Sequence, residues 1–171
     1  HKLYFNEKSL KIAEEILKIH ENFGINYYVL SEEINDFSDF IIVYYKGEIN
    51  KGKSVCVVGT RTISSYGNYY SIEIAKDLVK KGYCINSGLA LGIDCTTQKQ
   101  TLNEGGKVQA FMAGGLDKCY PYKNKDLFNE IAAKGAVISP FPAGIKPRKY
   151  SFLQRNKLMC AFSDFVVLVE A

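Results

Sequence analysis

Short clusters of glycines and cationic residues are the part of this chain that could do chemistry, and the chemistry they suit is phosphate binding. Gly59 and Arg61 follow directly after an apolar run. Glycine lets a ligand approach the backbone, and the arginine guanidinium is a planar fork of N–H donors that matches phosphate oxygens. Further donors stand near the end of the chain, in the sequence Arg155-Asn156-Lys157. We therefore predict phosphate contacts at both places.

Two other clusters are rich in glycine but hold no cation. Gly88 and Gly92 stand before a helical pattern, and backbone N–H groups at the start of a helix form a cradle for an anion. The same two glycines could instead serve only a tight turn, with Asp94 complementing the helix dipole. The pair Gly114-Gly115 likewise either admits a ligand to the backbone or forms a simple turn. Both interpretations stay open for each cluster.

Aromatic residues accompany the last cationic cluster. Tyr150 and Phe152 lie within a few residues of Arg155. Rings beside phosphate donors are typical of proteins that stack the bases of single-stranded nucleic acid. Phe152 is therefore a candidate for base stacking, and the alternative is that it packs in the core.

Histidine is missing from the glycine-rich region, and no arrangement of residues for catalysis or metal binding is evident there. Both histidines, His1 and His20, precede residues 41–171, so histidine acid–base chemistry and histidine metal ligation are excluded there. No second carboxylate or histidine stands beside Asp94. No metal or disulfide spacing is present among the five cysteines, which are Cys56, Cys84, Cys95, Cys119 and Cys160. We predict a binding protein without catalytic residues, metal or cofactor.

Charge is unevenly distributed along the chain. Residues 1–40 hold 4 lysines and 8 acidic residues, a net charge of −4, whereas residues 41–171 carry a net charge of +8. No acidic residue occurs in residues 131–163, which contain six cations. Such a stretch suits a polyanionic partner, although it could also be a solvated face. The longest apolar runs are too short to cross a bilayer and no secretory signal is present, so we expect a cytoplasmic protein.

The elements that must position these clusters repeat at regular intervals. Helical patterns separate five short apolar runs, which begin at residues 54, 83, 108, 136 and 165. Strands that alternate with helices in this way form a parallel sheet covered on both faces. The sequence predicts an α/β fold with a Rossmann-like, doubly wound, mainly parallel sheet. Ligands of such sheets bind at the carboxyl ends of the strands, where the glycine clusters fall.

The first part of the chain follows a different pattern. The spacing of Leu10, Ala13, Ile16 and Leu17 predicts an amphipathic helix over residues 7–21, which Gly24 ends. Short extended segments are expected at 25–30 and 40–45. We therefore predict an N-terminal extension of helix and strands over residues 1–50, followed by the Rossmann-like domain over residues 51–171.

In chain order, these clusters resemble the DNA-processing protein A family, also called DprA or Smf. The resemblance is carried by Val58-Gly59-Thr60-Arg61, Tyr66-Gly67, Ser87 to Asp94, Gly115-Leu116-Asp117, Tyr120-Pro121, Ser139, Pro142, Arg155-Asn156-Lys157 and Val169-Glu170-Ala171. Residues 41–47 are also similar to the segment that leads into the family's domain. Family members continue past the position of Ala171, so the resemblance implies a domain that is incomplete at its C-terminus.

The resemblance also implies a function. It implies that single-stranded DNA binds in a basic pocket, with its phosphates held by Arg61, Ser87, Gly88, Gly92, Arg155 and Asn156 and with Lys157 as a further cation. Proteins of this family protect incoming DNA during natural transformation, help to load the recombinase RecA, and form homodimers through the part of the chain that follows. They are not known as enzymes.

Two other functions are compatible with a Rossmann-like fold. One is a nucleotide-processing enzyme of the lysine-decarboxylase-like phosphoribohydrolase type, which needs a Pro-Gly-Gly-x-Gly-Thr-x-x-Glu element. The double glycines here, Gly105-Gly106 and Gly114-Gly115, neither follow proline nor lead to Gly-Thr. The other is a sensor of a small nucleotide, although the G-x-G-x-x-G fingerprint of dinucleotide binding is absent.

Overall fold

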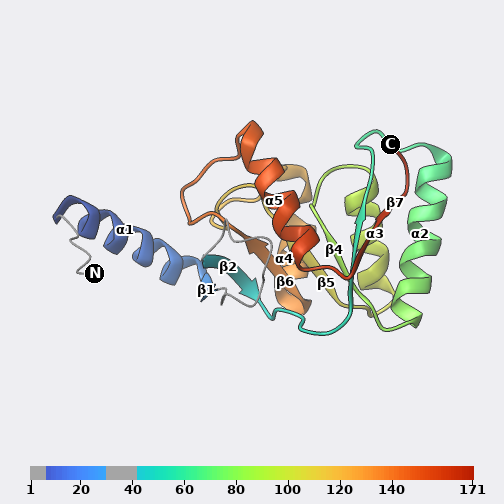
Figure 1. The fold of residues 1–171 in the computed structure, drawn as a ribbon, viewed down its shortest axis with the longest axis horizontal. Coiled ribbons are helices and arrows are strands. Elements are labelled where there is room, and N and C mark those ends of the chain that lie inside the picture. Colours follow the sequence, from blue (N-terminus) through green and yellow to red (C-terminus); the bar gives the residue numbers. More distant parts are fainter. Residues whose placement is uncertain (1–6, 30–41) are drawn as a thin grey trace.

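A computed structural model describes residues 7–29 and 42–171 of the chain (Figure 1). Its helices are α1 (Glu7–Phe23), α2 (Ser65–Lys80), α3 (Ile93–Asn103), α4 (Lys125–Lys134) and α5 (Lys149–Ala161), with a 3-10 turn at Tyr122–Asn124. The strands are β1 (Asn26–Val29), β2 (Ile42–Gly47), β3 (Ser54–Val58), β4 (Cys84–Ser87), β5 (Val108–Phe111), β6 (Ala136–Ser139) and β7 (Phe165–Leu168). All five predicted strands of the Rossmann-like part are present.

The strands form one seven-stranded sheet in the order β1-β2-β6-β5-β4-β3-β7. The five strands from β3 to β7 pair in parallel, and β2 runs antiparallel to both β1 and β6. The prediction of a mainly parallel α/β sheet is confirmed. β2 belongs to the same sheet as the later strands, and the domain boundary near residue 50 stays a prediction.

The two extended segments expected before residue 50 overlap β1 and β2, although β2 continues two residues past the predicted end at residue 45, to Gly47. Residue 30 of the first segment and residues 40 and 41 of the second lie outside the described residues. The described parts pair with each other, so both segments belong to the sheet.

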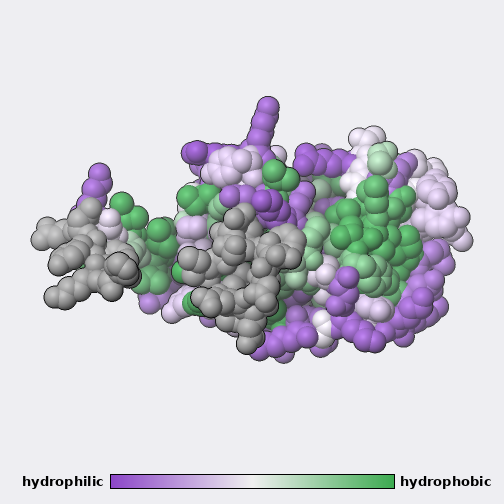
Figure 2. All heavy atoms as spheres, viewed as in Figure 1, coloured by the Kyte–Doolittle hydropathy of each residue, from purple (hydrophilic) through white to green (hydrophobic). Residues whose placement is uncertain are grey.

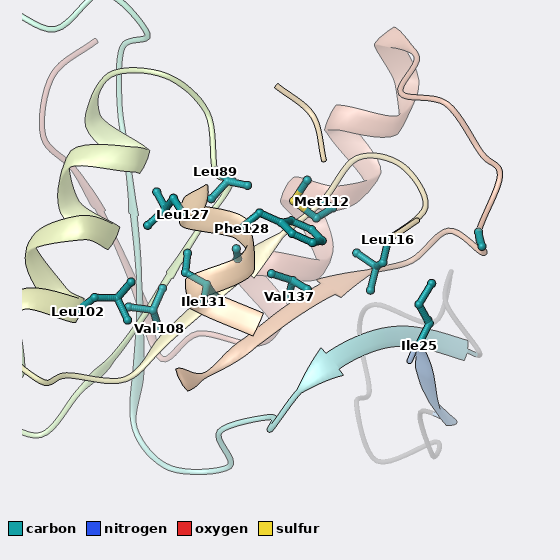
Figure 3. Close-up of a cluster of buried hydrophobic side chains, with 12 residues drawn as sticks. Ile25, Leu89, Leu102, Val108, Met112, Leu116, Leu127, Phe128, Ile131 and Val137 are labelled. Atoms are coloured by element: carbon teal, nitrogen blue, oxygen red, sulfur yellow. The ribbon is translucent and has the colours of Figure 1, made fainter. Parts of the chain in front are cut away.

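Apolar side chains on both faces of the central strands explain why helices cover the sheet on both sides. Val108 and Ala110 of β5 belong to a buried cluster with Leu127, Phe128 and Ile131 of α4 (Figure 3). Phe111, the next residue along β5, belongs instead to a cluster with Leu158 and Met159 of α5. Successive strand residues point to opposite faces. Ala75 and Leu78 of α2 pack with Val55 and Val57 of β3, whereas Cys56 between those two residues belongs to the α5 cluster. Hence α2, α3 and α4 cover one face, and α5 covers the other.

The first helix extends away from the rest of the molecule (Figure 1). It covers the predicted range and ends at Gly24, which has a positive φ of 59°. Leu10 and Leu17 of its apolar stripe expose 49% and 51% of their surface, so only the last turn of α1 packs on the sheet. Across the residues that the structure covers, no helix has the length and apolarity needed to cross a bilayer.

His20 attaches that last turn to the remainder of the fold. The buried imidazole accepts a hydrogen bond at Nε2 from the Ala143 N–H, at 3.1 Å, and lies edge-on against Tyr44 with 4.9 Å between ring centroids. Burial lowers the pKa of His20, and the charge of Asp117 opposes part of that shift. A neutral imidazole is required for this contact, because a protonated ring has no acceptor to offer.

We expect the folded protein to lose stability as the pH falls from above 6.5 through the lowered pKa of His20. The unfolded chain binds the proton more readily than the folded chain in that window, so acid favours unfolding. Urea denaturation between about pH 7.5 and pH 5.5 measures the effect, and the variant His20→Gln should show a smaller dependence on pH. Equal slopes in the two proteins would show that His20 is not responsible.

Candidate functional site

The glycine-rich and cationic clusters meet at the carboxyl edge of the parallel strands. The loops that follow β3, β4, β5 and β6 all leave this edge, and α5 begins beside them (Figure 1). These loops lie together because the strands that precede them are parallel, and parallel strands end at the same edge of a sheet.

Arg155 lies at the centre of this edge, with only 6% of its surface exposed. Its Nη1 donates hydrogen bonds to the carbonyl oxygens of Gly88, at 2.6 Å, and Phe111, at 2.5 Å. Its Nε donates to Asn156 Oδ1 at 2.9 Å. The guanidinium therefore ties α5 to the ends of β4 and β5, and burial lowers its pKa from the ordinary arginine value.

Asp94 binds the N–H group of Gly88, the residue whose carbonyl oxygen accepts from Arg155. Its Oδ2 accepts hydrogen bonds from the N–H groups of Gly88, at 3.0 Å, and Ala90, at 3.4 Å. Burial raises the pKa of this carboxyl, while the Arg155 charge and the two backbone donors act in the opposite direction. Two N–H groups of the predicted anion cradle are thus bonded to a carboxylate of the protein itself, and phosphate binding by Gly88 stays a prediction.

Gly92 and Gly59 bring the loop after β3 against the start of α3. Gly92 has a φ of 77°, and a Cβ on it would collide with the Thr60 carbonyl oxygen and with the backbone of Arg61. The Ile93 N–H donates to that same Thr60 oxygen at 3.2 Å. A Cβ on Gly59 would lie 2.6 Å from Ile93 Cγ1. Both glycines therefore allow two loops to touch, which fixes the place of Arg61.

Arg61 is exposed at this edge and lies against the half-buried ring of Phe152. The Arg61 guanidinium carbon lies 5.6 Å from the centre of the Phe152 ring, and the Arg155 guanidinium carbon lies 5.8 Å from the same ring. Phe152 is only partly buried, whereas Arg61 is exposed. Tyr120 lies edge-on to Phe152, with 6.0 Å between centroids. Arg61 is therefore a solvent-accessible cation supported by an aromatic ring, a favourable cation–π arrangement.

The remaining predicted residues have different surroundings. The buried Ser87 hydroxyl donates to the Val57 carbonyl at 2.7 Å, which joins β4 to β3. Gly114 and Gly115 pack closely against residues 142–147, and the Ser139 hydroxyl donates to the Gly114 carbonyl at 2.7 Å. Asn156 and Lys157 are exposed on α5. Arg61, Phe152 and Arg155 therefore lie together with the loop that contains Gly88 and Gly92. Gly114 and Gly115 lie in a different loop, which follows β5.

Sequence reasoning missed two residues that shape this edge. Asn124 precedes α4, and its side-chain amide donates to the Leu89 carbonyl at 2.9 Å, which holds the loop after β4 from a second side. Leu89 itself has a positive φ of 55°, unusual for a residue with a side chain. An asparagine before a helix predicts a cap, so nothing in the pattern indicated that its side chain would bond to a distant loop.

A cavity of about 1090 Å³ lies at the opposite edge, where the parallel strands begin. Its lining includes Ser54, Val108 and Gly135 and none of the residues predicted to bind phosphate. Within residues 7–29 and 42–171, no group of three or more histidine, cysteine or acidic side chains is arranged to hold a metal ion.

A doubly wound, mainly parallel sheet with glycine turns at its carboxyl edge defines a protein with a Rossmann-like fold, a class whose ligands bind at that edge. Within that class, the chain belongs to the DNA recombination-mediator protein A family, whose model matches residues 26–171. The resemblance indicated by the sequence motifs is confirmed.

Individual relatives agree with the family match. Protein Smf of Synechocystis is 37% identical over 136 residues, which are 76% of this chain and 34% of that protein. The structure of DNA processing protein A from Streptococcus pneumoniae superposes with a TM-score of 0.79 at 29% identity, covering 95% of this chain and 59% of that one. The Helicobacter pylori protein, whose structure is described as showing a single-stranded DNA binding mode, has a TM-score of 0.74 at 29% identity, over 84% of this chain and 68% of that one. The chain spans less than half the length of the curated relatives it matches.

Proposed function

We propose that this chain binds single-stranded DNA at the carboxyl edge of its sheet, through phosphate contacts and base stacking. The observation that carries the proposal is the contact of the exposed Arg61 with Phe152, whose ring centre also lies 5.8 Å from the buried Arg155 guanidinium carbon. An exposed cation beside a half-buried aromatic ring offers the two kinds of contact, to phosphate and to base, that proteins make with single-stranded nucleic acid. The family and the DNA-binding relative from Helicobacter pylori support the choice of ligand.

The proposal assigns different roles to the predicted residues. Arg61 contacts phosphate directly, because its guanidinium is exposed. Arg155 is a positioning residue, because the Gly88 and Phe111 carbonyls and the Asn156 side chain accept hydrogen bonds from its guanidinium. Lys157 and Asn156 lie on the exposed side of α5 and extend the polar surface. Ser87, Gly59 and Gly92 hold the two loops that carry the contacts.

For the whole protein we propose the role that its family membership favours. It would act in the cytoplasm as a DNA-binding protein rather than an enzyme, protect incoming single-stranded DNA during natural transformation, and pass it to RecA. Homodimer formation belongs to the same proposal. Support comes from the family match and from the relatives named DNA processing protein DprA in Bacillus subtilis and Streptococcus pneumoniae.

Arg61→Ala tests the site itself. We expect it to weaken the binding of a labelled oligonucleotide of about 20 nucleotides by about tenfold, because one phosphate contact and its released counterion are lost. Fluorescence anisotropy at several salt concentrations should also show a slope of log K against log salt that is shallower by about 0.7. Lys107→Ala is the matched control, because it removes one exposed cation at the opposite edge of the sheet. Equal binding by the two variants would remove Arg61 from the site.

Calorimetry with a mononucleotide and with the same oligonucleotide separates DNA binding from the sensing of a small nucleotide. We expect the oligonucleotide to bind strongly and the mononucleotide weakly, because affinity for a polyanion grows with the number of phosphates contacted. Release of free base from a nucleoside monophosphate would favour the phosphoribohydrolase alternative.

A further inference from the structure

Three tyrosines form an exposed cluster at the start of α2, and the site described above does not use them. Tyr66, Tyr69 and Tyr70 expose 62%, 59% and 42% of their surface. Residues separated by three and four positions share one face of a helix. The centroids of Tyr66 and Tyr70 are 4.4 Å apart, and Tyr69 lies edge-on to Tyr70 at 5.2 Å. Three large rings are thus gathered in solvent on one helix face.

The tyrosine cluster adjoins the loop that carries Arg61. Four residues separate Arg61 from Tyr66, and α2 begins at the carboxyl edge of the sheet (Figure 1). The Ser64 side chain caps the helix by accepting from the Gly67 N–H at 3.0 Å, and Glu170 accepts from the Ser64 N–H at 3.1 Å. These contacts fix the first turn of α2 relative to the Arg61 loop.

The buried side of α2 explains why the rings point outward. Gly67, Ser71, Ala75 and Leu78 are buried and turn the opposite face of the helix toward the sheet. The Glu170 carboxylate lies against Gly67 and accepts from the Ser64 N–H, and the first turn of α2 itself contains no acidic residue. Weakly polar surface is visible at this end of α2, beside the hydrophobic patch that the space-filling view shows over β7 (Figure 2).

We propose that the tyrosine cluster stacks bases of the same DNA strand after it leaves Arg61. The inference rests on the proposed function and extends it to a second contact on α2. The short connection between Arg61 and the capped start of α2 favours DNA as the occupant, because a strand bound at Arg61 would pass close to the rings that follow four residues later. Uncharged ring faces suit bases rather than phosphates, and stacking on them requires no particular sequence.

Paired variants test the cluster. The double variant Tyr69→Ala, Tyr70→Ala should bind an oligonucleotide of about 20 nucleotides about tenfold more weakly than wild type, whereas Tyr69→Phe, Tyr70→Phe should bind it as wild type does. A strand of about four nucleotides, which reaches only the Arg61 site, should bind all three proteins equally. Replacing the bases outside that short segment by abasic sugars should weaken wild type to the level of the alanine variant. Circular dichroism confirms that each variant is folded.

Crosslinking gives an independent readout. A strand that carries iodouracil should crosslink on illumination to the tryptic peptide 62–76, which contains all three rings. Loss of affinity in the phenylalanine variant, unchanged affinity in the alanine variant, or crosslinks that avoid this peptide would each overturn the inference. Arg61→Ala separates this failure from failure of the proposed function: it should weaken both oligonucleotide lengths even if the tyrosines contribute nothing. A wild-type protein that binds neither length would overturn both proposals.

Discussion

Arg155→Ala should destabilise the fold by about 3 kcal/mol or more, because it removes the donor from two buried carbonyl oxygens. The carbonyl oxygens of Gly88 and Phe111 would lose the hydrogen-bond donor that the guanidinium now provides. The variant should also lose most of its DNA binding, since α5 and the loop after β4 would no longer be held together. Urea denaturation and fluorescence anisotropy measure the two effects.

The stability deficit of Arg155→Ala should depend on pH. The Arg155 charge lowers the pKa of the buried Asp94, whose pKa burial raises. Without the arginine that pKa rises further, so ionised Asp94 destabilises the variant most at neutral pH. Protonation of Asp94 removes this part of the cost, and the difference between variant and wild type should shrink as the pH falls.

A double-mutant cycle with Asp94→Asn isolates the coupling between the two residues. We expect the double variant to lose less unfolding free energy than the two single variants lose in sum. Each single change leaves one buried charge without its partner, whereas the double change removes both charges. Lys149→Ala is the control on the same helix: Lys149 is exposed, so its loss should change stability little. Additive energies in the cycle would show that Asp94 and Arg155 act independently.

The regular spacing of continuous apolar runs was sufficient to predict the strands β3 to β7. Val55, Val57, Ile85 and Val108 lie in continuous apolar runs because their strands are covered on both faces, and such runs are visible in a single sequence. The convergence of the glycine clusters also followed, since parallel strands end at one edge. The antiparallel addition of β1 and β2 could not be predicted, because short extended segments do not specify their neighbours.

The roles of individual side chains were harder to predict than the place of the site. A sequence shows that residue 155 is a cation but not that two carbonyls from distant strands would enclose it. A sequence also does not show that the Asp94 carboxylate accepts hydrogen bonds from the Gly88 and Ala90 N–H groups. Such long-range hydrogen bonds leave no periodic signal, whereas the contact of Arg61 with Phe152 joins residues that the pattern had already placed at one edge.

Gly92→Ala should lower both stability and DNA binding, although Gly92 carries no side chain that could contact a ligand. Its φ of 77° with a ψ of −129° is a conformation that residues other than glycine rarely adopt, and the strain costs about 1–3 kcal/mol. The added methyl group would also press on the Thr60 carbonyl and the Arg61 backbone. Relief of that collision moves the Arg61 loop, so the cation leaves its place over Phe152.

Gly105→Ala separates the two causes. Gly105 also has a positive φ, 70°, but no atom lies within 4 Å of the position its Cβ would take. It should therefore show the backbone strain alone and bind oligonucleotides as wild type does. Thermal unfolding and anisotropy of both variants give the comparison, with Gly92→Ala expected to be the less stable and the only one to bind weakly. If both variants bound DNA normally, the contact between Gly92 and the Arg61 loop would not be what positions the cation.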